Sequence, residues 1–387
     1  MKRLFLLVLL TSILVPAYSA EIPFIKEDWQ KARAMAAGQN KMLLVDFYTD
    51  WCSWCRVMDT TTFRDSAIVA YVNEHFIPLS IDAERGFGIT VAMKYRVNAY
   101  PSYGYFTSDG RMVLKSLGYQ TAEEYIKTLR DAVARNDAGL VYEGVSPEAD
   151  PGFPEFFRKA LGTKSDRIKP DQDAVDAYLA RQTDLFSEVN FSLICHFPTT
   201  DSISEFVLAN SLRYEKLYGK DDVEMKISSI ISDRLRAAIG RKDTVLLHNV
   251  LALSDRYATG DRDAIHAQYL MRYYGGTKDW KKYAEMVSQA IGSGKMSDGG
   301  INSAAWTIYE NCDDAAIVET AVGWMAKIID EGSPYAYLDT YAAILHKDGQ
   351  DTKAEEYALK AIGKGKSDKE DVTATEELLT KIRGHIQ

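Results

Sequence analysis

Two cysteines that follow directly on an apolar run constrain the fold more than any other feature of this chain. The run covers residues 42–48, and residues 51–55 read Trp-Cys-Ser-Trp-Cys. A Cys-x-x-Cys pair is either a redox dithiol or half of a zinc site. Zinc requires four ligands, whereas the remaining cysteines, Cys195 and Cys312, are isolated and distant in sequence. A strand followed at once by the cysteines therefore favours the redox interpretation.

The pattern predicts a helix that begins at the first cysteine, Cys52, and packs through Val57, Met58 and Phe63. The first amide groups of a helix lack partners and carry partial positive charge, so they stabilise an anion. A thiol at this position loses its proton more easily, and the thiolate is the reactive form. Cys52 is therefore the predicted nucleophile. Cys55, one turn further along, is the predicted resolving thiol that closes the intramolecular disulfide.

The segment 45–52 resembles the first central strand and the Trp-Cys motif of the thioredoxin family. In that family a buried acidic residue lies six positions before the first cysteine, and Asp46 stands at that spacing from Cys52. The resemblance implies that Asp46 exchanges a proton with Cys55. A carboxylate in an apolar strand is also expected to have a raised pKa. The alternative is a residue at the strand end that only bonds to the backbone.

A second segment, Tyr100-Pro101, resembles the cis-proline loop of the same family. A strand (103–106), a turn (108–111) and a partner strand (112–114) follow it, and a helix is predicted from Thr121. This order is the one expected of the family, so the resemblance implies an α/β thioredoxin fold, with a mixed central sheet flanked by helices, over about residues 24–135.

The resemblance also implies where a substrate would bind. In the family the backbone before the proline pairs with a substrate peptide, so Tyr100 and Pro101 are candidate substrate-binding residues. We add Trp51 and Trp54 to them, because each tryptophan directly precedes one of the two cysteines. Trp54 could instead serve as an aromatic lid over the site. The Ser-Trp dipeptide between the cysteines departs from ordinary thioredoxin, which leaves the direction of electron flow open.

The N-terminus predicts export. Lys2 and Arg3 precede an apolar run (4–15) and a small-residue segment (17–20), which is the order of a cleaved signal peptide over residues 1–20. An uncleaved anchor is the alternative, although the run is shorter than the roughly 20 residues that a bilayer needs. The expected location is therefore the periplasm or the exterior. In such an oxidising compartment Cys195 and Cys312 form a disulfide or stay as buried thiols, and we favour buried thiols.

Composition excludes several other functions. The formal net charge of the 387 residues is −9, and no basic run offers a footprint for phosphates, so nucleic acid is not an expected partner. The histidines are scattered without metal-ligand spacing, and we expect no metal and no organic cofactor beyond the Cys52–Cys55 disulfide. Cys195-His196 is interpreted as part of a core. Asp221 and Asp222 are interpreted as solvated residues at a helix end.

The remainder of the chain is predicted to be helical. We place a thioredoxin-like domain at 21–138, a turn-rich linker at 139–152, a helical region at 153–300 and a second one at 301–387. The last region resembles a tetratricopeptide repeat, in which small residues let paired helices approach closely. Gly349 separates its two helices, and the small residues are Ala354, Ala358 and Ala361. Such an all-α, repeat-like domain either binds a protein partner or packs as a scaffold.

The predicted function is an exported thiol–disulfide oxidoreductase, and specifically a disulfide reductase acting on protein substrates. A reductase in an oxidising compartment requires an upstream electron donor, for which a membrane thiol protein is expected. Two alternatives stay open. The chain could be a non-catalytic scaffold that binds clients through its thioredoxin-like domain, or a disulfide isomerase whose helical half supplies a client surface.

Overall fold

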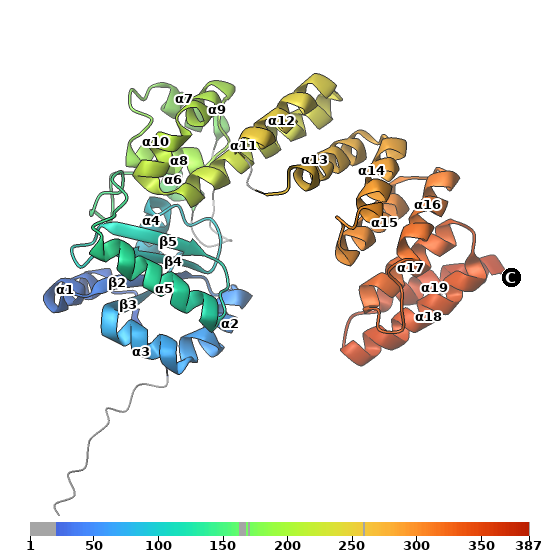
Figure 1. Cartoon of the computed structure of the whole chain (residues 1–387), viewed down its shortest axis with the longest axis horizontal. Coiled ribbons are helices and arrows are strands. Elements are labelled where there is room, and N and C mark those ends of the chain that lie inside the picture. The colour runs from blue at the N-terminus through green and yellow to red at the C-terminus, as the bar shows by residue number, and fades with distance from the viewer. Residues whose placement is uncertain (1–20, 162–167, 169–170, 258–259, 387) are drawn as a thin grey trace, which may run out of the picture. The chain divides into compact units, whose positions relative to one another are not determined.

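A computed structural model describes residues 21–161, 168, 171–257 and 260–386 (Figure 1). The chain forms two compact units, Met1–Ile227 and Ser228–Gln387, which are described separately. The predicted signal peptide at 1–20 lies outside the described residues. Among the described helices, none combines the length and the apolar composition needed to cross a bilayer.

The N-terminal unit is built on a five-stranded mixed sheet with the strand order β1-β3-β2-β4-β5. Strands β1 and β2 run parallel to β3, and β4 runs antiparallel to both β2 and β5. The predicted fold class is therefore confirmed. The strands are β1 (Ile25–Lys26), β2 (Met42–Tyr48), β3 (Phe76–Asp82), β4 (Ser102–Phe106) and β5 (Met112–Leu117).

Helices cover both faces of this sheet because the central strands are apolar on both sides. Helices α3 and α5 pack against each other and against the strands, and Figure 1 shows α5 lying across the sheet. Thr121 caps α5 in a reciprocal arrangement with Glu124. The helices are α1 (Trp29–Gln39), α2 (Ser53–Thr60), α3 (Ser66–His75), α4 (Gly86–Lys94) and α5 (Ala122–Asp137).

Successive side chains along β2 point to opposite faces of the sheet, so the position of Asp46 in the strand fixes the face on which it lies. Met42 and Leu44, which have the same parity as Asp46, belong to a buried cluster with Met58 of α2 and with residues of α3 and α5. Phe47 has the opposite parity, and its ring lies 6.1 Å from that of Tyr95, which follows α4. Asp46 therefore lies on the sheet face that α2 covers.

In the described part of the N-terminal unit five short helices follow α5, and two of them, α6 and α8, pack against α4 (Figure 1). The segment 139–152 connects them to the sheet. The Tyr142 amide donates to the Met112 carbonyl at 2.9 Å, and the Gly144 amide donates to the Leu217 carbonyl at 2.9 Å. The domain limits expected from composition remain predictions. The helices are α6 (Glu155–Ala160), α7 (Gln172–Ala180), α8 (Glu188–His196), α9 (Asp201–Ala209) and α10 (Ser211–Tyr218).

A buried ionic cluster holds the start of the next helix, α11 (Lys220–Arg241), to the sheet. Arg96 donates from Nε to Asp222 Oδ2 at 2.6 Å, and the Lys115 ammonium of β5 donates to the other carboxylate oxygen. The interpretation of Asp222 as a solvated residue is therefore wrong, because only 3% of it is exposed. Burial alone would raise the pKa of Asp222, but Lys115 and Arg96 outweigh burial and hold this pKa below its usual value.

The C-terminal unit is all helical in its described part, and the helices from residue 280 onward share one apolar cluster. Ala354, Ala358 and Ala361 of α18 are fully buried, so α17 and α18 approach closely, and Gly349 between them has a positive φ of 79°. The tetratricopeptide assignment itself remains a prediction. The helices are α11 (Lys220–Arg241), which begins in the N-terminal unit, α12 (Thr244–Tyr257), α13 (Arg262–Thr277), α14 (Trp280–Gly292), α15 (Asp298–Asn311), α16 (Ala315–Met325), α17 (Tyr335–Lys347), α18 (Asp351–Asp368) and α19 (Thr373–Ile386).

The ionic cluster leads to a stability prediction. Asp222→Ala would leave the Arg96 and Lys115 charges buried without their carboxylate, so we expect it to lower the free energy of unfolding by about 3–5 kcal/mol. The neighbouring, exposed Asp221 is the matched control, and Asp221→Ala should change this energy by less than about 0.5 kcal/mol. Urea unfolding followed by circular dichroism measures both. Equal effects of the two substitutions would contradict the role assigned to the cluster.

Candidate functional site

The predicted cysteines form a closed disulfide at the start of α2. The Cys52–Cys55 bond joins Cα atoms 5.3 Å apart, and Cys52 is the N-cap of the helix. The Cys55 amide donates to Cys52 Sγ at 3.0 Å, so the sulfur occupies the position of a helix-capping oxygen. When the disulfide is reduced, this amide and the helix terminus favour a thiolate at Cys52. Exposure does not distinguish the two residues, since they are 3% and 6% exposed.

Asp46 lies on β2, on the sheet face beneath α2, and only 5% of it is exposed. Burial, and next the charge of Asp59 on α2, raise the pKa of Asp46 to about 7. Lys26 and a hydrogen bond from Ser80 Oγ to Asp46 Oδ2 at 3.4 Å oppose this shift. The carboxyl group therefore exchanges a proton near neutral pH, which is the property required of a general acid–base group.

Trp51 stands at the edge of the disulfide and is held from two sides. Its indole Nε1 donates to Glu84 Oε2 at 2.9 Å, and Glu84 comes from the turn after β3. The ring of Tyr100 meets the indole edge-on, with centroids 5.7 Å apart. Trp51 is 58% exposed. Its indole is therefore held in one orientation and is still accessible from solvent.

Trp54, between the cysteines, pairs with a residue from another loop. Its ring centroid lies 5.3 Å from that of Tyr119, which follows β5, and Trp54 is 56% exposed. The Tyr100–Pro101 bond is cis, and Pro101 directly precedes β4. The disulfide is thus bordered by two aromatic pairs, one with Trp51 and Tyr100 and the other with Trp54 and Tyr119.

The profile of thioredoxin-like domains matches residues 29–133. The chain is 34% identical to a candidate disulphide-isomerase of Bacteroides thetaiotaomicron with a solution structure, covering 29% of this chain and 93% of that one, with a TM-score of 0.28. The chain belongs to the thioredoxin-like family.

Two curated relatives of this thioredoxin-like protein are more distant. The thiol:disulfide interchange protein DsbD of Vibrio vulnificus is 27% identical over 122 residues, which cover 30% of this chain and 20% of that protein. A protein disulfide-isomerase of Hordeum vulgare is 24% identical over 139 residues, covering 36% and 22% respectively. The match thus spans about a fifth of these relatives. Together with the Cys52–Cys55 disulfide, the comparisons confirm the predicted class of chemistry for this domain, thiol–disulfide oxidoreduction.

Three side chains of the thioredoxin-like site were not singled out from the sequence: Asp59, Glu84 and Tyr119. A signal existed for Asp59, because it follows Cys55 by four residues and such pairs share a helix face. Glu84 and Tyr119 had no such signal. Each meets its tryptophan only because the loops after β3 and β5 end at the same edge of the sheet as α2 begins.

The other two cysteines are free thiols; Cys312 is buried, as favoured from the sequence, whereas Cys195 is only partly buried. Cys312 is buried at the end of α15. Burial, and next the charge of Asp222, raise the pKa of the Cys195 thiol to about 12, so it stays protonated. Burial lowers the pKa of His196 to about 4, and this ring bonds to the Ser192 carbonyl at 2.7 Å. The pair Cys195-His196 is therefore not poised for nucleophilic chemistry.

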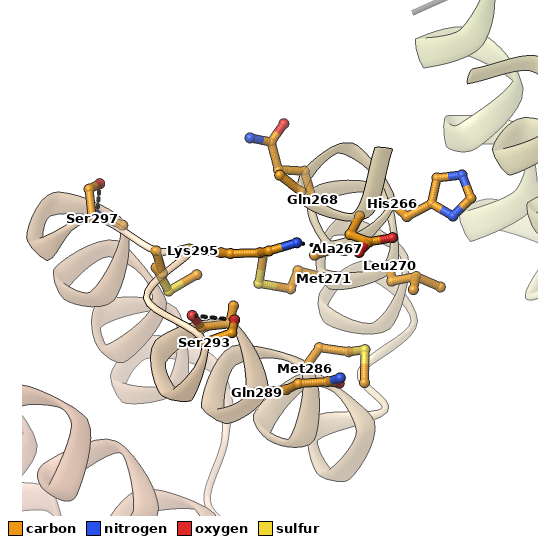
Figure 2. Close-up of a pocket in the computed structure, with 15 residues that line it drawn as sticks. His266, Ala267, Gln268, Leu270, Met271, Met286, Gln289, Ser293, Lys295 and Ser297 are labelled. Atoms are coloured by element: carbon orange, nitrogen blue, oxygen red, sulfur yellow. Dashed lines mark hydrogen bonds and ion pairs between the residues drawn. The ribbon is translucent and has the colours of Figure 1, made fainter. Parts of the chain in front are cut away.

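The C-terminal unit contains a separate cavity of about 730 Å³ among α13, α14 and the start of α15. Methionines supply much of its apolar lining, namely Met271, Met286 and Met296. Figure 2 shows Lys295 extending across the opening toward α13, where it pairs with Asp263 at 3.3 Å. All residues around this cavity belong to the helical unit, so it is distinct from the disulfide site.

The pKa of Asp46 has a consequence for stability. The unfolded chain ionises this carboxyl near pH 4 and the folded chain near pH 7, so between these values the folded state holds one more proton. Its stability should therefore fall as the pH rises through this window.

Asp46→Asn removes the ionisation. We expect the variant to gain stability over the oxidised wild type between pH 4 and pH 8, by up to about 3–4 kcal/mol. Urea unfolding at both pH values measures the gain, and exposed Asp131→Asn serves as the control. A gain that does not change with pH would show that the Asp46 pKa is unshifted.

Proposed function

We propose that the chain is an exported disulfide reductase that acts on protein substrates through Cys52 and Cys55. The observation that carries this proposal is the disulfide at the first turn of α2 above a buried Asp46 whose pKa is about 7. A scaffold has no need of an acid–base group beneath its disulfide, so this combination favours the enzyme over the non-catalytic alternative.

In the first step the Cys52 thiolate of the reduced protein attacks one sulfur of a substrate disulfide. A Cys52–substrate disulfide forms, the substrate S–S bond breaks, and the displaced substrate sulfur leaves as a thiolate. The Cys55 amide, which donates to Cys52 Sγ in the oxidised structure, supports this nucleophile by stabilising its negative charge.

In the second step Cys55 resolves the mixed disulfide. Asp46, as the carboxylate, takes the proton from the Cys55 thiol, and the resulting thiolate attacks Cys52 Sγ. The Cys52–Cys55 disulfide closes and the second substrate sulfur leaves, so the substrate gains two electrons and the protein loses two. Because the pKa of Asp46 is about 7, the carboxylate is available near neutral pH and can release the proton afterwards.

The two aromatic pairs form the proposed substrate-binding rim. Trp51 and Trp54 keep more than half of their surfaces exposed, and such amphipathic rings bury large apolar areas on binding. A substrate peptide at Pro101 would lie between them. We infer that the preferred substrates carry apolar side chains next to the disulfide.

Regeneration of the dithiol requires two electrons from outside the chain. We propose an upstream membrane thiol protein as the donor and the periplasm as the location. The charged, apolar and small-residue order of residues 1–20 supports export, and the similarity to DsbD, a thiol:disulfide interchange protein, supports a thiol relay. The helical unit is proposed to bind a protein partner.

The order of attack can be tested with single-cysteine variants. Cys55→Ser should react with a protein disulfide and stop at the mixed disulfide, because the resolving thiol is gone. Cys52→Ser should form no such adduct and should reduce insulin only at the uncatalysed rate. Non-reducing gels and mass spectrometry detect the adduct. Adduct formation by both variants at equal rates would contradict the assignment of Cys52 as the nucleophile.

The direction of electron flow is tested by the reduction potential of the Cys52–Cys55 pair in the mature protein. We expect a value near the thioredoxin end of the scale, about −270 mV, from equilibration against dithiothreitol or glutathione. A value of about −180 mV would favour the isomerase alternative, and a value of about −120 mV would indicate an oxidant. A pair that fails to exchange over hours would leave only the scaffold.

A further inference from the structure

Three side chains that are distant in sequence converge at one end of the C-terminal unit. His346 lies in the last turn of α17, Asp351 is the first residue of α18, and His385 lies in the last turn of α19. Their ligand-type atoms all lie within 4.8 Å of one another. We infer that these three residues form a binding site for a divalent transition-metal cation, and specifically for Zn²⁺.

The carboxylate of Asp351 faces both imidazoles. Its Oδ1 lies 2.5 Å from His346 Nδ1, and its Oδ2 lies 3.4 Å from His385 Nδ1. The two rings meet edge-on with centroids 5.2 Å apart. Two ring nitrogens and a carboxylate thus lie close together at this end of the unit, and all three are ligand types that bind zinc in proteins.

The helices around the site are fixed by packing. Leu378, Leu379 and Ile382 of α19 belong to the apolar core of the unit. His385 follows the fully buried Ile382 by three residues and therefore leaves the helix on the same side. The neighbouring turn of α19 is tied to α18 by an ion pair of 2.6 Å between Arg383 and Glu355.

The donor set selects the class of cation. Two imidazoles and one carboxylate suit Zn²⁺ and its neighbours in the transition series, whereas Mg²⁺ and Ca²⁺ prefer oxygen ligands alone. A tetrahedral zinc ion holds its ligand atoms roughly 3.3 Å apart, given bonds of about 2.0–2.1 Å. The His346 and Asp351 side chains are 17% and 18% exposed, while that of His385 is 73% exposed. The 3.4 Å distance between His385 Nδ1 and Asp351 Oδ2 already matches this spacing. The hydrogen-bonded pair His346 Nδ1 and Asp351 Oδ1 must separate by roughly 0.8 Å when the ion enters, and water would take the fourth position.

Bound zinc would join the turn between α17 and α18 to the C-terminal helix. A cation that binds only the folded state stabilises it by mass action, so the melting temperature of the helical unit should rise with zinc concentration. The site does not depend on the proposed reductase activity, because none of its ligands belongs to the thioredoxin-like domain.

The test uses the untagged mature protein with the Cys52–Cys55 disulfide closed, so that this dithiol cannot bind zinc. Isothermal titration with ZnCl₂ should show one saturable equivalent, and MgCl₂ should show none. We expect His385→Ala and Asp351→Asn each to weaken binding by at least about tenfold and to abolish the zinc-dependent rise in melting temperature. His248→Ala, which removes an exposed histidine of α12 in the same unit, is the matched control and should bind as the wild type does.

Asp351→Asn preserves the shape of the side chain, and His385 is exposed, so neither substitution should unfold the unit. Circular dichroism of the metal-free variants checks this. Absorption of the Co²⁺ form should show nitrogen and oxygen ligation without a sulfur charge-transfer band. The inference is overturned if no saturable equivalent binds, if the band shows thiol ligation, or if both variants bind zinc as tightly as the control.

Discussion

The N-terminal unit depends on the buried ion pairs that the Asp222 carboxylate forms with Arg96 and Lys115. This carboxylate lies where three separate segments meet, since Arg96 follows α4, Lys115 belongs to β5 and Asp222 opens α11. Burying these charges would be costly unless they satisfied one another, so the segments must be placed together. The guanidinium also lies 4.9 Å from the ring centre of Tyr218 in α10. Helices α6 to α10 and the start of α11 are therefore part of the same compact unit as the sheet.

Within this frame the redox site uses two opposite environments only a few residues apart. Cys52 occupies a helix terminus, where unpaired amides favour negative charge. Asp46 lies beneath the same helix in an apolar layer, where negative charge is disfavoured and the pKa rises to about 7. The same helix thus offers its terminal amides to a negative charge at Cys52 and, by excluding water, raises the pKa of the Asp46 carboxyl. The pairing suits a reaction in which a proton must move as a thiolate forms.

Much of this site could be predicted because its signals are local. The run 42–48, the N-cap cysteine and the turn at 108–111 act within a few residues, and each element begins or ends close to where the sequence indicates. The partners of Trp51 and Trp54 could not be predicted. Glu84 and Tyr119 lie more than thirty residues away in sequence, and only the order of the strands brings their loops to this edge.

The sequence by itself determined the thioredoxin-like domain, the cysteine pair at the start of α2 and the helical character of the second half, because these depend on periodicity and on spacing within a helix or strand. Only the tertiary structure decided which charges are buried and which histidines meet. In the sequence, Asp222 cannot be distinguished from other acidic residues at the start of a helix. Its contacts with Arg96 and Lys115 exist only in the folded structure. His346 and His385 are separated by a whole helical hairpin in sequence, yet their rings lie 5.2 Å apart. Such contacts arise when segments that are distant in sequence pack together, so local sequence patterns do not predict them.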